Sequence, residues 1–375
     1  MIHAPHISYN FYFKFSAEDE ITTFMMSLCL QSGVSHTIRR ALLYEDVIDL
    51  YSNKLETILS EFPFRVGFEG ELAIDTGGVT RDMISAFFEE MYIKHFDGAA
   101  LLVPLDIPNV SAPPFSVLGA IFSHAYLAAG MLPVKIAFPT LASILLPAST
   151  VGCLPDDLLL ETFLDSLSPH DYMVCKDALK IAQRSDEYFS SALQMNLVTV
   201  LSRYTVRETP KPHNLLSILV SVAKHHFLRK PAYFVSEMRA AFPAQHIPFW
   251  SLLSYEHFYD IYRAQQASAS KVLALIEDPQ TSNPNEERVY GYLQQFIGSL
   301  RGDELRSLLR FATGSSVCGS SITVCFNNLQ GLARRPTSHT CSHCLELPSA
   351  YSSYGEFQQE FLAVLNGDEW CMDAI

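Results

Sequence analysis

The chain has 375 residues, which is long enough for two or three packed units, each with its own core. Hydrophobic residues make up 49% and charged residues 18%, a composition typical of a globular chain and unlike that of a disordered one. The formal net charge is −14 and no basic stripe is visible, so nucleic acid is not an expected partner, because such a chain repels a phosphate backbone.

The first third of the chain predicts a helix, a strand and a second helix. Residues 1–35 are an aromatic-rich lead-in without a strong pattern, and residues 36–62 contain neither glycine nor proline and predict a helix. Alternating apolar residues over 64–68 predict a short strand, and Asp-Thr-Gly-Gly at residues 75–78 predicts a turn. The helix expected after this turn has one apolar face, formed by Ile84, Phe87, Phe88 and Met91.

The middle of the chain predicts a mainly helical structure. A proline-rich loop at residues 104–114 precedes two helical stretches, around residues 115–131 and 138–146. Residues 157–275 are predominantly helical in pattern, with breaks where prolines occur. No fixed-period repeat is visible.

The apolar run at residues 115–134 is the nearest approach to a membrane span. Ser116, Ser123, His124 and Pro133 interrupt it, and it is short for a span. We therefore expect a buried helix here and no membrane partner.

The clearest predicted domain boundary is DPQTSNPN at residues 278–285, where two prolines and no apolar residue indicate a linker. After it come two helical stripes, the second ended by Gly314, a strand at residues 322–326 and a last helix beginning near Tyr354. These elements predict a compact α+β unit after a large, mainly helical part. The predicted division is a lead-in over residues 1–35, a large unit over 36–277, the linker over 278–285 and a small unit over 286–375.

The eight cysteines are scattered along the chain, which is not the pattern of a small disulfide scaffold. The first 15 residues lack the basic and apolar regions of a signal peptide. We therefore expect mostly free thiols in a reducing compartment, in the cytoplasm, the nucleus or both.

Residues 334–347, RRPTSHTCSHCLEL, concentrate reactive side chains, and three interpretations compete for them. Structural zinc usually needs two C-x-x-C pairs, and here Cys341 and Cys344 form one, with Cys318 and Cys325 at an unusual spacing. A dithiol redox pair usually starts a helix, which Pro348 prevents.

The third interpretation is a single nucleophilic cysteine, Cys341, on a loop. Arg334, Arg335, His339 and His343 could favour its thiolate form. A buried, inert cysteine is the competing interpretation, and these residues alone leave the two evenly balanced.

Longer stretches around these residues resemble HECT ubiquitin ligases. PTSHTCSHCLELPSAYSSY is similar to the family's catalytic-cysteine segment, with Pro336, His339, Thr340 and Cys341 in place, followed by a Leu-x-Leu-Pro run at residues 345–348. LLRFATGSS at residues 308–316 resembles a signature at the base of the family's C-terminal lobe. FEGELAIDTGGVTRD at residues 68–82 resembles an N-lobe segment, and residues 115–134 are similar to an N-lobe helix. Within the family, the small unit is most similar to the G2/M-phase-specific ligase-like branch.

The resemblance implies an α+β, bilobal catalytic unit in which an N-lobe, a hinge at residues 278–285 and a C-lobe carry the function. A ubiquitin-charged conjugating enzyme would dock on the N-lobe, ubiquitin would pass to Cys341 as a thioester, and a lysine of a protein substrate would then receive it. His339 and Thr340 would support the thiolate or the oxyanion. Neither a cofactor nor a metal is implied, and Cys344 is interpreted as a packing residue.

Two further features qualify this prediction. Asp75, Gly77, Gly78 and Arg81 match the N-lobe motif and are interpreted as structural, with Asp75 bonding backbone or Arg81. HECT ligases commonly have a phenylalanine four residues from the C-terminus, important for lysine transfer, and here Met372 stands at that position. The alternative is therefore an impaired pseudo-ligase that binds the conjugating enzyme or ubiquitin without turnover.

Overall fold

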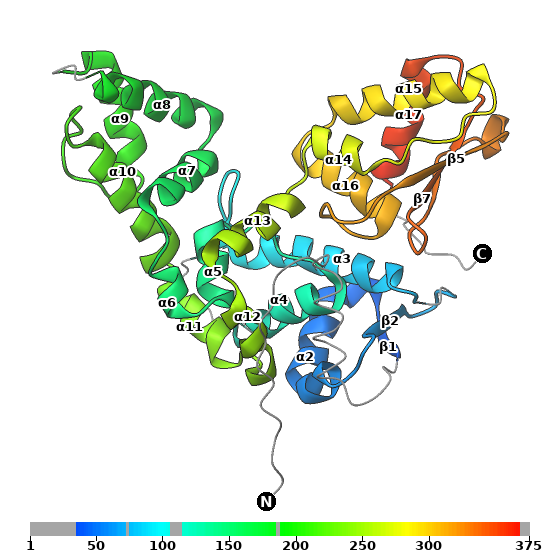
Figure 1. Cartoon of the computed structure of the whole chain (residues 1–375), viewed down its shortest axis with the longest axis horizontal. Helices are drawn as coiled ribbons and strands as arrows, with labels where there is room; N and C mark the ends of the chain where they lie inside the picture. The colour runs from blue at the N-terminus through cyan, green and yellow to red at the C-terminus, as the bar shows by residue number, and fades with distance from the viewer. Residues whose placement is uncertain (1–34, 73–74, 106–114, 185–187, 368–375) are drawn as a thin grey trace, which may run out of the picture.

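The computed structural model describes residues 35–72, 75–105, 115–184 and 188–367. A central body carries a helical arm at one end and a C-terminal module at the other, and the C-terminal module lies over α3 of the body (Figure 1). Each of these three parts has an apolar core of its own. The predicted lead-in, apart from Ser35, and the predicted Met372 anchor lie outside the described residues.

The central body begins with a parallel pair of short strands. β1 (Ser35–Ile38) pairs with β2 (Arg65–Phe68), so that His36 lies opposite Val66. The connection between them contains the 3-10 helix η1 (Arg40–Leu42) and α2 (Leu43–Leu59). The helix predicted over residues 36–62 therefore forms only over its middle, and the prediction is wrong for residues 36–38, which belong to β1. After the predicted turn come α3 (Gly78–His95) and the antiparallel strands β3 (Phe96–Asp97) and β4 (Val103–Pro104).

The apolar stretch predicted as a buried helix forms α4 (Phe115–Ala129), followed by α5 (Phe138–Leu145) and α6 (Ala148–Val151). Leu118 and Phe122 are fully buried in the body, and a Cβ on Gly119 would lie only 2.0 Å from the carbonyl oxygen of Met238. Glycine therefore lets α4 pack directly against the backbone of α11 (Ala232–Ala240). Among the described residues, no helix has both the length and the apolar character needed to cross a membrane.

The helical arm leaves the body after α6 and folds on a separate apolar core that includes Phe163, Leu197, Leu219 and Phe227. Its elements are α7 (Asp156–Ser166), α8 (Pro169–Gln183), α9 (Ser191–Ser202), α10 (Leu215–Lys224) and the π-helical turn η2 (His225–Arg229). The chain then returns to the body through α11, η3 (Ala244–His246), α12 (Ile247–Leu252) and α13 (Tyr255–Gln265).

The C-terminal module is an α+β unit in which helices pack on a three-stranded sheet. Strand β7 is central, parallel to β5 and antiparallel to β6. The module comprises α14 (Ala269–Leu275), α15 (Pro284–Ser299), α16 (Gly302–Thr313), β5 (Thr323–Asn327), η4 (Gly331–Ala333), β6 (Thr337–His339), β7 (Cys344–Pro348) and α17 (Tyr354–Leu365). Phe296 and Phe361 stack in its core with ring centroids 4.9 Å apart, and both are fully buried.

The division between the body and the C-terminal module lies earlier than the linker predicted at residues 278–285. Val272 on α14 is fully buried in the core of the module, and Ile276 forms a bridge with Ile322. The chain therefore enters the module at residues 266–268, between α13 and α14. The predicted linker is an exposed connection inside the module, where Asn283 caps α15 by accepting from the backbone N–H of Glu286.

The predicted fold class is confirmed. Helices dominate the described residues, the sheets are small, and the whole is an α+β fold consistent with a bilobal arrangement. Gly314 ends α16 in the left-handed conformation, with φ of 77°, as the sequence predicted.

Candidate active site

Cys341 lies in the tight turn that joins β6 to β7. His339 and Cys344 are paired across this hairpin, and the four residues between them form what we call the Cys341 turn, residues 340–343. His343 has a positive φ of 54°, and its carbonyl oxygen accepts a hydrogen bond from the backbone N–H of Thr323 on β5. The side chain of Cys341 is exposed, as a nucleophile on a loop requires.

The N-terminus of α3 is organised by Asp75, which is buried. One carboxylate oxygen accepts from the backbone N–H groups of Gly77, at 2.8 Å, and Thr80, at 3.3 Å, and the other accepts from Val66, at 3.0 Å. Gly77 has a φ of 111°, a conformation that favours glycine. Asp75 therefore bonds backbone and shapes the turn that leads into α3.

Gly78 brings the Cys341 turn into contact with the central body. A Cβ at this position would lie 2.7 Å from Thr340 Oγ1 and 3.1 Å from Cys341 Sγ. A larger residue here would force the Thr340 and Cys341 side chains, or the turn itself, to shift. The sulfur thus lies beside the first turn of α3, where the helix dipole is positive.

Arg81 holds the Cys341 turn from the same helix. Its guanidinium donates to the carbonyl oxygens of Thr313 and Thr340, both at 2.9 Å, and to Nε2 of His343, at 2.8 Å. Burial lowers the pKa of Arg81, and its neighbours Cys341 and Asp75 act in the opposite direction. Arginine stays protonated in proteins, so a positive charge is held near the sulfur.

The bond from Arg81 fixes the protonation state of His343. Nε2 must accept, so the imidazole is neutral and carries its proton on Nδ1. The pKa of His343 is lowered, first by burial and then by the charge of Arg81.

His339 and Thr340 differ in their surroundings. His339 is partly exposed on β6, and its Nε2 lies 3.6 Å from a carboxylate oxygen of Glu346 on β7. The carbonyl oxygen of Thr340 accepts a hydrogen bond from Arg81, and its hydroxyl oxygen lies close to Gly78. Of the two, Thr340 is the residue that the structure joins to the α3 side of the site.

A buried carboxylate on α3, next to Arg81 in sequence, links the central body to the C-terminal module. Asp82, whose side chain is 2% exposed, accepts from Arg40 Nη1 at 2.8 Å and from Arg310 Nε at 2.7 Å. Arg40 belongs to the body and Arg310 to α16, so one carboxylate connects both. Such a charge is tolerated in a buried place because both partners are positive.

Hydrogen bonds of Ser85 complete the contact between α3 and the module. Its hydroxyl donates to the carbonyl oxygen of Gly314 and accepts from the N–H of Ser316, both at 2.9 Å. A Cβ on Gly314 would lie 2.6 Å from the carbonyl oxygen of Gly78. The segment at residues 308–316, singled out in the sequence, is therefore part of the surface through which the module contacts α3.

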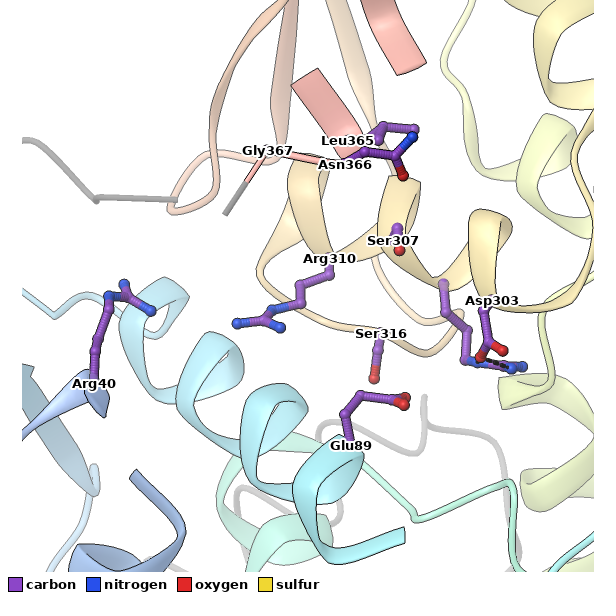
Figure 2. Close-up of a pocket in the computed structure, with 10 residues that line it drawn as sticks. Arg40, Glu89, Asp303, Ser307, Arg310, Ser316, Leu365, Asn366 and Gly367 are labelled. Atoms are coloured by element: carbon purple, nitrogen blue, oxygen red, sulfur yellow. Dashed lines mark hydrogen bonds and ion pairs between the residues drawn. The ribbon is translucent and has the colours of Figure 1, made fainter. Parts of the chain in front are cut away.

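A cleft of about 360 Å³ lies beside this contact, between α3, α16 and the end of α17 (Figure 2). Glu89 enters it from α3, and Arg310 and an Asp303–Arg306 ion pair enter it from α16. Charges of both signs line the cleft and Cys341 does not, so the cleft is separate from the candidate nucleophile.

The other interpretations of the cysteine-rich stretch find no support in the described residues. No group of three or more metal-ligating side chains occurs among them. Cys344 starts a strand, not a helix, and its sulfur lies 3.3 Å from Cys325 Sγ on β5.

Residues 223–370 match the HECT-domain (ubiquitin-transferase) family model. The HECT match includes Cys341, the segment at 308–316 and the whole C-terminal module, and it supports a ubiquitin-transferase function. It covers less than half of the chain and begins after α3, so Gly78 and Arg81 lie outside it. No curated protein matches the chain.

Several residues of the HECT-like site were not predicted to act together. The sequence pattern predicted a structural role for Gly78 and Arg81 in another lobe, whereas both contact the Cys341 turn. Asp82, Ser85 and Arg310 were not singled out as a contact at all. The two resembling segments, at residues 68–82 and 308–316, were the available signal, because both meet at this interface.

Proposed function

We propose that this chain is a HECT-type E3 ubiquitin ligase that accepts ubiquitin from a conjugating enzyme as a thioester on Cys341 and transfers it to a substrate lysine. The observation that carries the proposal is the exposed Cys341 sulfur on the Cys341 turn, beside the N-terminus of α3 and the guanidinium of Arg81. The HECT match over residues 223–370 supports the same reaction class.

The reaction would proceed in two acyl transfers. The Cys341 thiolate attacks the thioester carbonyl at the C-terminus of ubiquitin, and the resulting tetrahedral intermediate expels the thiolate of the conjugating enzyme. A lysine amine of the substrate then attacks the new thioester, an amide forms, and the Cys341 thiolate leaves as the amine loses a proton. Each transfer needs chiefly a well-placed thiolate and the exclusion of water.

We propose that the conjugating enzyme docks on the helical arm. Large apolar side chains are exposed there, including Met195 at 71%, Leu216 at 55% and Val198 at 46%. Exposed large apolar side chains on a protein surface are typical of binding surfaces. We assign this surface to the conjugating enzyme, and aspartate at Met195 or Val198 should weaken thioester formation without unfolding the arm.

A thioester assay tests the main proposal. The chain is mixed with a charged conjugating enzyme and analysed on gels with and without reductant. Wild-type protein and Cys344→Ala should form a reductant-sensitive ubiquitin adduct, and Cys341→Ala should form none. An adduct that persists in Cys341→Ala would exclude Cys341 as the acceptor.

The pseudo-ligase remains the second candidate, because Met372 replaces the phenylalanine of the family pattern. A thioester that forms but does not discharge to free lysine, and that discharges in Met372→Phe, would favour an impaired enzyme. Binding of the conjugating enzyme without any thioester would favour a pure interaction module.

We also propose a family branch and a cellular location. The similarity of the small unit to the G2/M-phase-specific ligase-like branch and a cytoplasmic or nuclear location both rest on sequence features alone. Imaging of the tagged full chain tests the location.

A further inference from the structure

A second pair of sulfurs lies next to the Cys341 turn. Cys325 on β5 and Cys344 on β7 lie on adjacent parallel strands, and their Sγ atoms are 3.3 Å apart. Cys325 is exposed and Cys344 partly so. The neighbours Val324 and Leu345 are buried on the other face of the sheet, so both thiols belong to the face that solvent reaches.

The structure separates this pair from the C-x-x-C pair that the sequence suggests. Cys344 starts β7 and its thiol donates a weak hydrogen bond to Cys325. The sulfur of Cys341 lies instead beside Gly78 of α3. Cys344 thus has a sulfur partner within van der Waals distance, and this partner is not the candidate nucleophile.

The chemistry of the two thiols differs. Burial raises the pKa of Cys344 to about 12, and its bond to Cys325 adds to this effect. Cys344 therefore remains a thiol near neutral pH, and Cys325, which accepts its hydrogen bond and is exposed, is the sulfur that an oxidant meets first.

We propose that Cys325 and Cys344 form a reversible disulfide when the protein meets a hydroperoxide. The sulfur of Cys325 attacks the peroxide, the O–O bond breaks, and a sulfenic acid and one molecule of water or alcohol form. The sulfur of Cys344 then attacks the sulfenic sulfur, the S–S bond forms, and water leaves with the thiol proton. Two thiols are oxidised by two electrons and the peroxide is reduced; a dithiol such as dithiothreitol reverses the change.

This disulfide would join β5 to the residue that follows the Cys341 turn. Thr323 N already donates to His343 O at 3.0 Å, so the disulfide would add a covalent link where β5 and the end of the Cys341 turn are already hydrogen-bonded. It would also occupy Cys344, which is the thiol closest in sequence to Cys341. Mild oxidation should therefore leave Cys341 free to react.

Peptide mapping tests the proposal without any ligase reaction, so its outcome is independent of the proposed function. The reduced full chain is treated with hydrogen peroxide, remaining thiols are blocked with N-ethylmaleimide, and tryptic peptides are analysed without reductant. Trypsin cleaves after Arg334, which separates Cys325 from Cys344. Fragmentation then assigns the link to Cys318 or Cys325 in one peptide and to Cys341, Cys344 or Cys371 in the other.

The expected product is a Cys325–Cys344 cross-link that disappears with dithiothreitol, together with maleimide on Cys341. Cys325→Ser and Cys344→Ser should each abolish it, and Cys341→Ser should retain it. Cys153→Ser is the matched control, because Cys153 is exposed but donates to the carbonyl oxygen of Ser149, and it should also retain the cross-link. A dominant Cys341–Cys344 cross-link, a link of either sulfur to another cysteine, or sulfinic acid at Cys325 without a cross-link would overturn the proposal.

Discussion

The guanidinium of Arg81 donates a hydrogen bond to the carbonyl oxygen of Thr340, 2.9 Å away, although 259 positions separate the two residues. The same side chain reaches Thr313 and His343, so one arginine on α3 holds both the end of α16 and the Cys341 turn. The position of the candidate nucleophile therefore depends on a residue of the central body.

Arg81→Ala should release the Cys341 turn. Hydrogen bonds from a charged donor contribute about 1.5–3 kcal/mol each. We therefore expect the amides of residues 340–343 to exchange at least about tenfold faster with deuterium, a factor that corresponds to ~1.4 kcal/mol. Arg81→Lys should fall between, because one ammonium cannot serve three acceptors in a fork. Exposed Arg65 on β2 gives the control: Arg65→Ala should leave this exchange unchanged, and equal exchange in Arg81→Ala would contradict the role assigned to Arg81.

Gly78→Ala should weaken the contact between α3 and the module, because the new Cβ would lie 2.7 Å from Thr340 Oγ1 and 3.1 Å from Cys341 Sγ. Overpacking of this kind typically costs 1–3 kcal/mol, and we expect about that loss in the free energy of unfolding measured with urea. Gly291→Ala is the control: Gly291 lies inside α15 with open space around it, and alanine there should stabilise by about 0.5–1 kcal/mol. Equal stability of Gly78→Ala and wild type would show that the turn can move aside freely.

His343→Asn should separate the backbone role of His343 from its bond to Arg81. Asparagine tolerates the positive φ of 54° but lacks the ring nitrogen that accepts from Arg81. In wild type, acid should loosen the turn, since a protonated ring cannot accept. The folded-state pKa of His343 is lowered. The bond from Arg81 to His343 is therefore fully retained above the ordinary histidine pKa and is lost as the pH falls below it.

Exchange rates of residues 340–343 between pH 7 and pH 5, corrected for intrinsic rates, check this. Wild type should gain exchange as the pH falls, and His343→Asn should exchange faster throughout with a flatter pH dependence. An identical pH response of both proteins would assign the effect to another group.

The sequence predicted those parts of the fold that depend on local patterns. The apolar stripe from Tyr354 to Leu365 formed α17, and Gly314 ended α16, because both signals act within a few residues. The boundary was misplaced, because a polar loop between α14 and α15 has the same composition as a linker. Only the burial of Val272 in the core of the C-terminal module shows that the boundary lies before residues 278–285.

The candidate site, too, could be predicted from the sequence only where it depends on local patterns. Cys341 could be singled out because its neighbours are consecutive residues, and the turn that displays it is local. The approach of Gly78 to Thr340 and the bridge through Asp82 depend on how two separately folded units meet. Periodicity and spacing carry no information on such a contact, and neither does the sulfur pair formed by Cys325 with Cys344 across two strands.

Asp82→Asn should strongly weaken the contact between the body and the module. The carboxylate is almost completely buried between Arg40 and Arg310, and asparagine removes its charge-assisted hydrogen bonds, although Arg40 keeps Glu71 as a partner. We expect a loss of about 1.5–3 kcal/mol in the free energy of unfolding. Asp303→Asn provides the control for an exposed ion pair at the same contact, because Asp303 is 75% exposed beside the neighbouring cleft (Figure 2) and pairs with Arg306 and with Lys135 of the body.

Exposed ion pairs contribute roughly 0–1 kcal/mol, so the Asp303→Asn change should be small. Comparable losses in the two variants would mean that Asp82 acts as an ordinary surface charge. Urea unfolding at low and high salt gives a second test, since the difference between the variants should persist in salt if Asp82 is shielded from solvent.

Two buried histidines in the central body should make the protein acid-sensitive. The rings of His124 and His246 lie 6.2 Å apart, each has Nδ1 bonded to a hydroxyl, of Tyr51 and Ser123 respectively, and each leaves Nε2 buried without a partner. Burial lowers the pKa of His124 to about 3 and that of His246 to about 4. The unfolded chain takes up these protons near the ordinary histidine pKa, whereas the folded chain does not.

Both groups are neutral in the folded and unfolded chain above pH 6.5, so the pH dependence begins only below it. Between pH 6.5 and about 4 the unfolded state binds more protons, and stability should fall by roughly 1.4 kcal/mol per pH unit for each histidine. His246→Gln should lower this slope by roughly 1.4 kcal/mol per pH unit, because one of several histidines with a lowered pKa, among them His226 at about 4, no longer titrates. Exposed His213 supplies the control, and urea unfolding of His213→Gln at pH 6.5, 5.5 and 4.5 should reproduce the wild-type slope. A slope unchanged by His246→Gln would show that carboxylates, and not the buried imidazoles, set the acid sensitivity.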